Sequence, residues 1–279
     1  MTITAPPDGP TGMPPHPWWT RLLPGASMGA LAVLERNAVS WRGRWLVFVS
    51  VLLEPVLFLL SIGVGVGTLV GEVDIGDGRT VPYRLFVGGG LLASSAMFGP
   101  VYDTTYNFFV KLKYRKVYDA ILATPVRTQD VIVGELLWSQ VRGAIYAAAF
   151  LATMVAMGLV ESWWAVLAVP VAALIGFAFA GVGLAASTYM RSFVDFDWVN
   201  VGIIPLFLLS AIFFPLSRYP DGWRTVVQLT PLYQGVRLER ALVLGDVSVA
   251  LLPSVAYLAA MGAAGLYVAS RRMRSLLQP

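Results

Sequence analysis

Six long apolar segments constrain the fold of this chain more than any other feature. Each is close to the ~20 residues that an α-helix needs to cross the hydrocarbon core of a bilayer. The segments run over Trp45–Val70, Arg84–Phe109, Val133–Val160, Ala165–Met190, Trp198–Leu216 and Val247–Ser270. Because backbone polar groups in lipid must pair within their own segment, such runs form helices. The sequence therefore predicts an all-α integral membrane protein whose six transmembrane helices occupy residues 45–279.

The composition agrees with a membrane protein. Hydrophobic residues make up 57% of the 279 positions and charged residues 13%, whereas soluble domains carry roughly 25% charged residues. Cysteine is absent and the one histidine, His16, lies in a proline-rich stretch, so we expect no disulfide and no metal site. The cations fall in short clusters between the apolar runs, which argues against nucleic-acid binding.

The N-terminal part precedes the first apolar segment. Residues 1–25 are rich in proline and glycine, a composition typical of disorder, and they lack the basic start and apolar run of a signal peptide. Residues 26–44 are amphipathic, with apolar residues three and four apart. We expect a helix in the membrane interface, with Arg36, Trp41 and Arg42 at the headgroups. A plain extension of the first span is the alternative.

The distribution of basic residues predicts the orientation. If both termini are cytoplasmic, 14 of the 20 Lys and Arg residues fall on the inside and 6 on the outside. Cytoplasmic loops carry such an excess. We therefore expect a multi-pass protein of a bacterial inner membrane with both ends in the cytoplasm.

Two ionisable residues lie inside predicted spans. Glu54 and Arg142 each follow the cytoplasmic start of their helix by about nine residues, hence by about 13 Å. Equal depth allows an ion pair between them. Alternatively, Arg142 extends to the headgroups while Glu54 faces a wet cavity.

The second cytoplasmic loop contains a short apolar piece, Val117–Ala123, after a basic run. It is too short to span, and Thr124-Pro125 ends it. A new helix begins near Thr128, with Thr128 or Asp130 as its N-cap. We expect Tyr118, Ile121 and Leu122 to form an apolar knob that needs a protein groove. A helix resting on the lipid surface is the alternative.

Residues 217–245 follow the fifth span on the predicted outside. They combine semi-apolar pieces with Pro220 and Pro231, and polar backbone at membrane depth must be packed against protein. We expect a pair of short re-entrant or interfacial helices here, with a plain external loop as the alternative.

The sequence contains no motif typical of a nucleotide-binding or catalytic site. The glycines Gly63, Gly65 and Gly67 lack the lysine of a phosphate-binding loop and instead favour close helix packing. No paired acids or nucleophile–histidine motif indicates a catalytic site.

Three stretches, taken together, resemble the type-2 permeases of ABC exporters. They are YRKVYDAILATPV with GELLW (Tyr114–Trp138), PLFLLSAIFFPLSRYPDGW (Pro205–Trp223) and LTPLYQGVRLER (Leu229–Arg240). The similarity is to the branch of nodulation lipo-oligosaccharide exporters and daunorubicin-resistance-type permeases, and it covers nearly the whole chain after Ala26. Relatives often carry a histidine where this chain has Gln234.

The resemblance implies a dimer, of identical or sibling permeases, bound to two ATPase subunits that hold ATP and magnesium. It implies an ATPase-coupling region of Tyr118, Asp119, Ile121, Leu122, Thr124 and Glu135. It also implies an external gate of Phe213, Phe214, Pro215, Pro231, Arg237 and Arg240. The expected substrate is amphiphilic or lipid-linked and moves outward. An ion-coupled secondary transporter and a membrane-embedded enzyme are the alternatives.

Overall fold

The computed structural model describes residues 27–41, 53, 56–76 and 78–277. Its helices in the first half are α1 (Met28–Trp41), η2 (Leu59–Val66), α3 (Gly67–Val70), α4 (Tyr83–Tyr102), η3 (Asp103–Asn107), η4 (Val110–Tyr114), α5 (Val117–Leu122) and α6 (Thr128–Ala156). Those in the second half are η5 (Trp163–Leu167), α7 (Ala168–Ser187), η6 (Phe193–Asp195), α8 (Phe196–Leu209), η7 (Leu216–Arg218), α9 (Asp221–Leu229), α10 (Pro231–Leu244), η8 (Val249–Leu251) and α11 (Leu252–Leu277). Strands β1 (Glu72–Gly76) and β2 (Arg79–Pro82) form an antiparallel hairpin.

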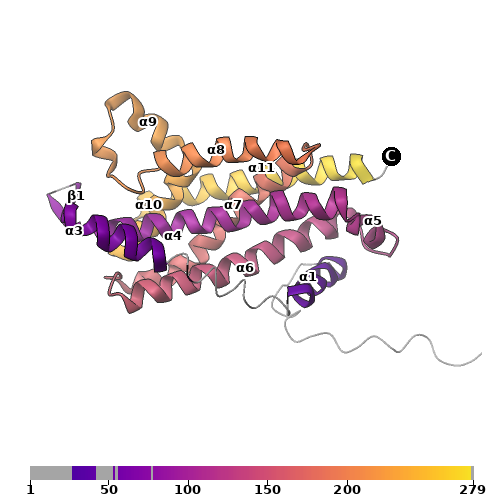
Figure 1. Cartoon of the computed structure of the whole chain (residues 1–279), viewed down its shortest axis with the longest axis horizontal. Helices are drawn as coiled ribbons and strands as arrows, with labels where there is room; N and C mark the ends of the chain where they lie inside the picture. Colours follow the sequence, from indigo (N-terminus) through magenta and orange to yellow (C-terminus); the bar gives the residue numbers. More distant parts are fainter. Residues whose placement is uncertain (1–26, 42–52, 54–55, 77, 278–279) are drawn as a thin grey trace, which may run out of the picture.

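The long helices α4, α6, α7, α8 and α11 run lengthwise beside one another (Figure 1). One end of this bundle carries α1, α5 and the C-terminus, and we call it the α5 end. The other carries the β-hairpin, α9 and α10, and we call it the hairpin end. All segments predicted to be cytoplasmic and described by the structure lie toward the α5 end, and those predicted to be external lie toward the hairpin end.

Three helical stretches are long and apolar enough to cross a membrane: Tyr83–Tyr114, Trp163–Ser187 and Val249–Leu276. They correspond to the predicted second, fourth and sixth spans. The predicted third span lies in α6, where Gln140 and Arg142 lower the hydropathy. The predicted first span lies partly outside the described residues, and its described part is the shorter apolar helix Val56–Val70. The total of six spans stays a prediction.

The boundary predicted for the fifth span is wrong. Helix α8 ends at Leu209 rather than at Leu216. Ala211 adopts a positive φ of 54°, which is unfavourable for a residue with a side chain. The chain therefore leaves the helix there, inside the apolar stretch.

Helix α7 lies at the centre of the bundle, in contact with α4, α6, α10 and α11. Its closest neighbour is α11, because glycines meet at the crossing: a Cβ on Gly181 would lie 2.5 Å from the carbonyl oxygen of Gly262. Small residues of this kind let helix backbones approach in membranes.

The half of the second span nearest the α5 end departs from regular α-helix. Pro100 lacks an N–H and interrupts the hydrogen-bond ladder, and two π-helical segments, η3 and η4, follow. The Thr104 hydroxyl donates to the Pro100 carbonyl at 2.7 Å. Wider turns of this kind often occur at functional sites.

The hairpin end contains a feature that the sequence analysis missed. Strands β1 and β2 pair Val73 with Val81, and Arg79 is 2.5 Å from Asp246, in the turn after α10. The ion pair thereby joins the loop after the first predicted span to the start of the last one.

Candidate functional site

The segment predicted to couple to a partner is a separate short helix. Helix α5 spans Val117–Leu122, close to the predicted Val117–Ala123. Its N-cap, Lys116, has a positive φ of 47°, which turns the chain sharply after η4. The following helix α6 begins at Thr128 with Arg127 as its N-cap, so neither predicted N-cap is correct; Asp130 instead accepts the Arg127 N–H at 2.9 Å.

The predicted exposed knob is partly wrong, because Tyr118 is buried. Its side chain is 1% exposed, and its ring lies 5.1 Å from that of Phe108. Burial, with the Glu135 carboxylate nearby, raises the pKa of the Tyr118 hydroxyl well above its ordinary value. Ile121 and Leu122 are half-buried against the same apolar cluster. Tyr118 thus anchors α5 to the bundle and leaves smaller groups on its surface.

The exposed side chains of α5 and of the turn after it are small or polar. Asp119, Ala120 and Thr124 are exposed. Beside them lies a groove of about 530 Å³ between α5 and α1, lined by residues that include Val33, Ala120 and Ile121. Helix α1 reaches this position because Gly134 of α6 has no Cβ, which would lie 2.6 Å from the Val33 Cβ.

Glu135 connects three elements at the α5 end. Its carboxylate lies 2.6 Å from the Lys111 ammonium of η4 and 3.8 Å from the Arg36 guanidinium of α1. Lys111 also donates to the Asn37 amide oxygen at 3.1 Å. A buried carboxylate needs such partners. The predicted coupling residue Glu135 therefore ties α1 to α6 and to the end of the second span.

Arg142 pairs with a residue that the sequence analysis overlooked. Its guanidinium lies 2.9 Å from the Asp103 carboxylate in η3 and 4.0 Å from the centre of the Trp41 ring. Asn107 donates to the same carboxylate at 2.8 Å. Arg142 is buried, so it does not extend to the headgroups. Glu54 and Arg42 lie outside the described residues. The sequence feature that could have predicted this partner of Arg142 is Asp103 itself, because it places a carboxylate within an apolar segment.

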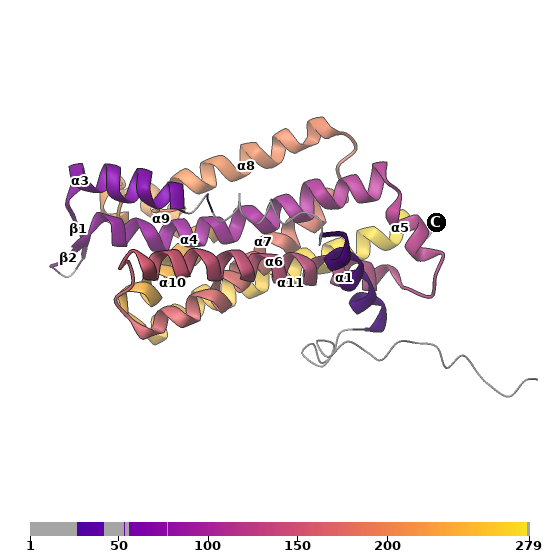
Figure 2. The ribbon, with the colours of Figure 1, turned by 60° about the horizontal axis from the view of Figure 1, so that its bottom comes forward.

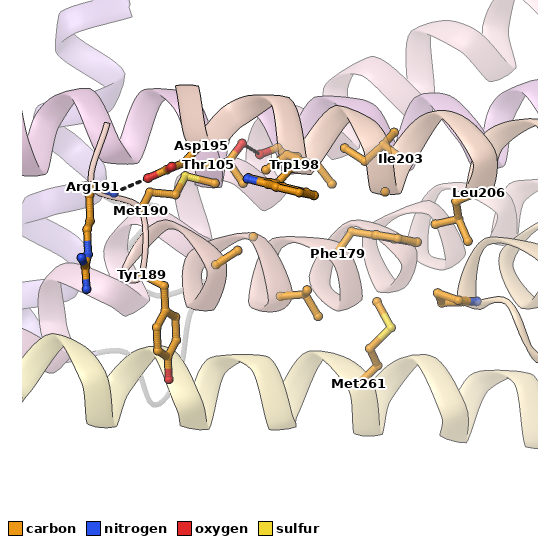
Figure 3. A pocket seen from close by; sticks show the side chains of 17 residues that line it. Thr105, Phe179, Tyr189, Met190, Arg191, Asp195, Trp198, Ile203, Leu206 and Met261 are labelled. Carbon is orange, nitrogen blue, oxygen red and sulfur yellow. Dashed lines mark hydrogen bonds between the residues drawn. The ribbon is translucent and has the colours of Figure 1, made fainter. Parts of the chain in front are cut away.

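An apolar cavity of about 710 Å³ lies between α4, α7, α8 and α11 (Figure 3). Phe179, Trp198, Ile203, Leu206 and Met261 are among its lining side chains. Helix α8 makes few contacts with the other long helices and runs along one side of the bundle (Figure 2). The cavity fills the space that this separation leaves.

Charged groups stand at one end of the apolar cavity only. Arg191 and Asp195 lie at its α5 end, and Figure 3 shows them apart from Ile203, Leu206 and Met261. The Asp195 carboxylate accepts the backbone N–H groups of Arg191 at 2.6 Å and of Ser192 at 3.1 Å. These hydrogen bonds lower the pKa of Asp195.

At the hairpin end, residues 217–245 form two helices, α9 and α10, rather than a plain loop. Pro231 occupies the first turn of α10, and the Thr230 hydroxyl caps it by accepting the Tyr233 N–H at 3.3 Å. Nine of the α10 residues are buried, because α10 packs against α4, α7 and α11. The helix is therefore part of the bundle.

Arg240 holds the irregular chain after α8. Its guanidinium donates to the carbonyls of Phe86 at 3.2 Å and Ala211 at 2.8 Å, and it lies 3.7 Å from the Phe86 ring centre. Arg240 thus satisfies the Ala211 carbonyl, which lies where the chain has left α8. Arg237 donates to the Ala250 carbonyl at 3.0 Å. Predicted gate residues therefore make structural contacts.

The remaining residues of the outer segment differ in exposure. Phe213 is half-buried and packs at right angles to Phe207, whereas Phe214 is exposed. Gln234 accepts the Ser254 hydroxyl at 2.6 Å. Glu239 was missed by the sequence analysis; it is fully buried, and neither carboxylate oxygen has a hydrogen-bond partner among the described residues.

Comparison with known proteins adds to this geometry. Residues 29–269 match the profile of the family described as ABC-2 type transporter. The chain is 31% identical to nodulation protein J of Rhizobium leguminosarum bv. trifolii over 226 residues, 80% of this chain and 84% of the relative. It is 30% identical to nodulation protein J of Rhizobium meliloti over 227 residues, 80% and 84% of the two chains. The inner membrane transport permease YadH of Escherichia coli is 26% identical over 191 residues, 67% and 72% of the two chains.

Proposed function

Because the chain belongs to the ABC-2 type transporter family, we propose that it carries an amphiphilic or lipid-linked substrate outward across a bacterial inner membrane. It is a transmembrane permease subunit of an ABC transporter and not itself an enzyme, and an ABC ATPase subunit is its partner. In our proposal, two ATPase copies hold ATP and magnesium. A second permease, identical or a sibling, completes the complex.

The proposed sidedness places the α5 end in the cytoplasm. Basic residues concentrate there, among them Lys111, Lys113, Arg115 and Lys116, as expected for cytoplasmic segments. Substrate would then enter near Arg191 and leave at the hairpin end, past Phe214 and the segment held by Arg240.

The apolar cavity is the observation that carries the substrate class. Its volume of about 710 Å³ suits a ligand with hydrocarbon chains. Aromatic and aliphatic side chains line most of its length, and charge occurs at the α5 end. A substrate with a polar head and an apolar tail matches this distribution, as in a glycolipid, a polysaccharide precursor or a hydrophobic drug.

The groove between α1 and α5 is the proposed ATPase contact. Asp119, Ala120 and Thr124 face outward beside it, while Tyr118 and Glu135 fix its walls to the bundle. Closure of the ATPase dimer would move α5, and the buried contacts would pass this motion to α6 and to η4.

The proposed substrate class can be tested with a substitution that partly fills the apolar cavity. Gly202 lines it, and a Cβ there would meet no heavy atom within 4 Å, so Gly202→Phe has room for its first side-chain atom and adds the volume of a ring at the cavity wall. The complex of this chain with its co-purified ATPase is reconstituted in vesicles, and ATP-dependent movement of labelled amphiphiles is measured. We expect Gly202→Phe to raise the half-saturating amphiphile concentration about tenfold and to leave ATPase binding intact.

Gly222→Phe is the matched control, since Gly222 also has open space around its Cβ position and lies outside the cavity. It should behave as the unmodified chain. Normal export by Gly202→Phe would contradict the role of the cavity. Export driven by an ion gradient without the ATPase would contradict the exporter proposal as a whole.

A further inference from the structure

A second cavity, of about 400 Å³, lies at the α5 end between α1, α6 and the π-helical part of the second span. The charged side chains that line it are Arg36, Asp103, Lys111, Arg115, Glu135 and Arg142. Cations outnumber carboxylates by four to two in this set. The cavity is distinct from the apolar one beside α8, with which it shares no lining residue.

Several hydrogen-bond donors in this cavity have no acceptor among the described residues. The Asn37 residue is 1% exposed; its amide oxygen accepts from Arg36 and Lys111, whereas its amide nitrogen has no acceptor among the described residues. The Nε atoms of Arg36 and Arg142 are likewise buried without an acceptor. A buried donor without a partner costs free energy, so this arrangement points to an anionic ligand that accepts these hydrogen bonds.

The carboxylates of the cavity do not fill this role. Asp103 is engaged by Arg142 and Asn107. Glu135 uses one oxygen for Lys111, and its other oxygen has no hydrogen bond among the described residues, although Arg36 lies 3.8 Å away. Arg115 is exposed at the rim, and its side chain has no hydrogen-bond or ion-pair partner among the described residues. An excess of positive charge therefore remains at the opening of this second cavity.

The position of the cavity indicates where the anion comes from. Trp41 and Trp138 both line it, with ring centres 6.2 Å apart, and tryptophan concentrates at the level of lipid headgroups. Tyr106, Val110 and Val117 add apolar wall. A phosphate attached to acyl chains lies at this level, whereas a free anion would gain nothing from these contacts.

We infer that the cavity between α1, η4 and α6 binds the phosphate of an anionic glycerophospholipid from the leaflet at the α5 end. Arg115 attracts the headgroup, and Arg36 and Asn37 donate to the phosphate. Such a lipid would fix α1 against the bundle. The inference does not depend on which substrate the protein exports.

The test is native mass spectrometry of the full chain in detergent micelles with phosphatidylglycerol. We expect one tightly retained copy, with Arg115→Gln and Asn37→Leu each weakening retention about tenfold, the effect of losing one hydrogen bond to a charged group. Arg274→Gln is the matched control, because Arg274 is an exposed cation of the α5 end outside the cavity. It should retain the lipid.

Three outcomes would overturn the inference. Equal weakening by Arg115→Gln and Arg274→Gln would mean that only surface charge attracts the lipid. Equal retention of phosphatidylcholine, or full displacement by millimolar inorganic phosphate, would mean that the cavity does not select an anionic lipid. Release of the lipid when the ATPase binds, with retention restored on its removal, would assign the cavity to the partner protein.

Discussion

Arg142 shows how a residue that is unfavourable in isolation becomes part of the structure. A charge in the middle of an apolar helix costs at least about 2.5 kcal/mol on insertion scales. Here the guanidinium meets the Asp103 carboxylate at 2.9 Å and the Trp41 ring at 4.0 Å. Removal of either member of a buried pair leaves the other uncompensated.

The Asp103–Arg142 pair gives the first prediction. Arg142→Met and Asp103→Leu should each lower the free energy of unfolding by about 3 kcal/mol, and the double variant should lose less than the sum. Unfolding by denaturing detergent measures all four chains of the cycle. Strictly additive losses would show that the two residues are not coupled.

Tyr118 gives a prediction about pH. Burial raises the pKa of the Tyr118 hydroxyl in the folded chain above its ordinary value of 10.0. The buried neutral hydroxyl is therefore fully compatible with the folded state below pH 10, and stability is lost as the pH rises toward the folded pKa. Between pH 8 and pH 11, the temperature of thermal unfolding should therefore fall more in the unmodified chain than in Tyr118→Phe. Tyr114→Phe, at an exposed tyrosine, should follow the unmodified chain; the same weakening in all three chains would disprove the assignment.

At the scale of elements, the glycines of α4 decide where α10 can lie. A Cβ on Gly89 would be 2.9 Å from the Arg240 Cα, and one on Gly90 would be 3.0 Å from the Ile212 side chain. Both α10 and the chain after α8 thus pack directly on the backbone of α4. The hydrogen bonds of Arg240 depend on this approach.

Gly89→Ala should therefore separate α10 from α4. We expect a loss of about 1–3 kcal/mol in stability, the usual cost of overpacking, together with reduced transport. Gly99→Ala on the same helix is the control, since its Cβ would lie 3.9 Å from the Tyr146 ring, in ordinary contact. Thermal unfolding compares the two; equal stability would show that α10 adjusts without cost.

Helix α5 allows anchoring and docking to be separated. Ala120 lines the groove toward α1, whereas Ala123, which is also exposed, does not. Ala120→Arg should preserve the thermal stability of the chain and lower co-purification of the ATPase at least about tenfold, because a desolvated charge would enter the contact. Ala123→Arg should have a smaller effect. Similar losses from both would indicate that the whole α5 surface docks, not the groove.

At the scale of the molecule, the two ends differ in chemistry. The α5 end gathers cations and the buried network around Glu135, and the hairpin end holds the β-hairpin, α9 and α10 (Figure 1). The ion pair between Arg79 and Asp246 joins two loops at the hairpin end. This division fits the proposal that the ATPase acts at the α5 end and that the substrate leaves at the hairpin end.

The cysteine-free chain makes the sidedness testable. Single cysteines are introduced as Thr80→Cys on the hairpin and Lys116→Cys beside α5, both at exposed positions. A membrane-impermeant thiol reagent added to intact cells should label the first and not the second, and inverted vesicles should give the reverse. Ser275→Cys, near the C-terminus, should match Lys116→Cys. Labelling of all three from one side would refute the proposed topology.

Sequence by itself determined the membrane class, the helical state of most described segments and the separate short helix that begins at Val117. These features follow from the hydropathy of the segments, from the spacing of apolar residues and from the helix end that Pro125 imposes. All of these act locally along the chain. The family resemblance followed from motifs in order, and comparison with known proteins confirms it.

Only the tertiary structure decided which charged residues meet and which side chains are buried. Asp103 and Arg142 are distant in sequence, and their pairing requires the crossing of two helices. The Tyr118 ring faces the bundle because Lys116 turns the chain back toward Phe108, which hydropathy does not encode. Arg240 reaches the Ala211 carbonyl because glycines let α10 lie on α4. Contacts of this kind depend on how the helices pack, and packing is a property of the whole chain rather than of any one segment.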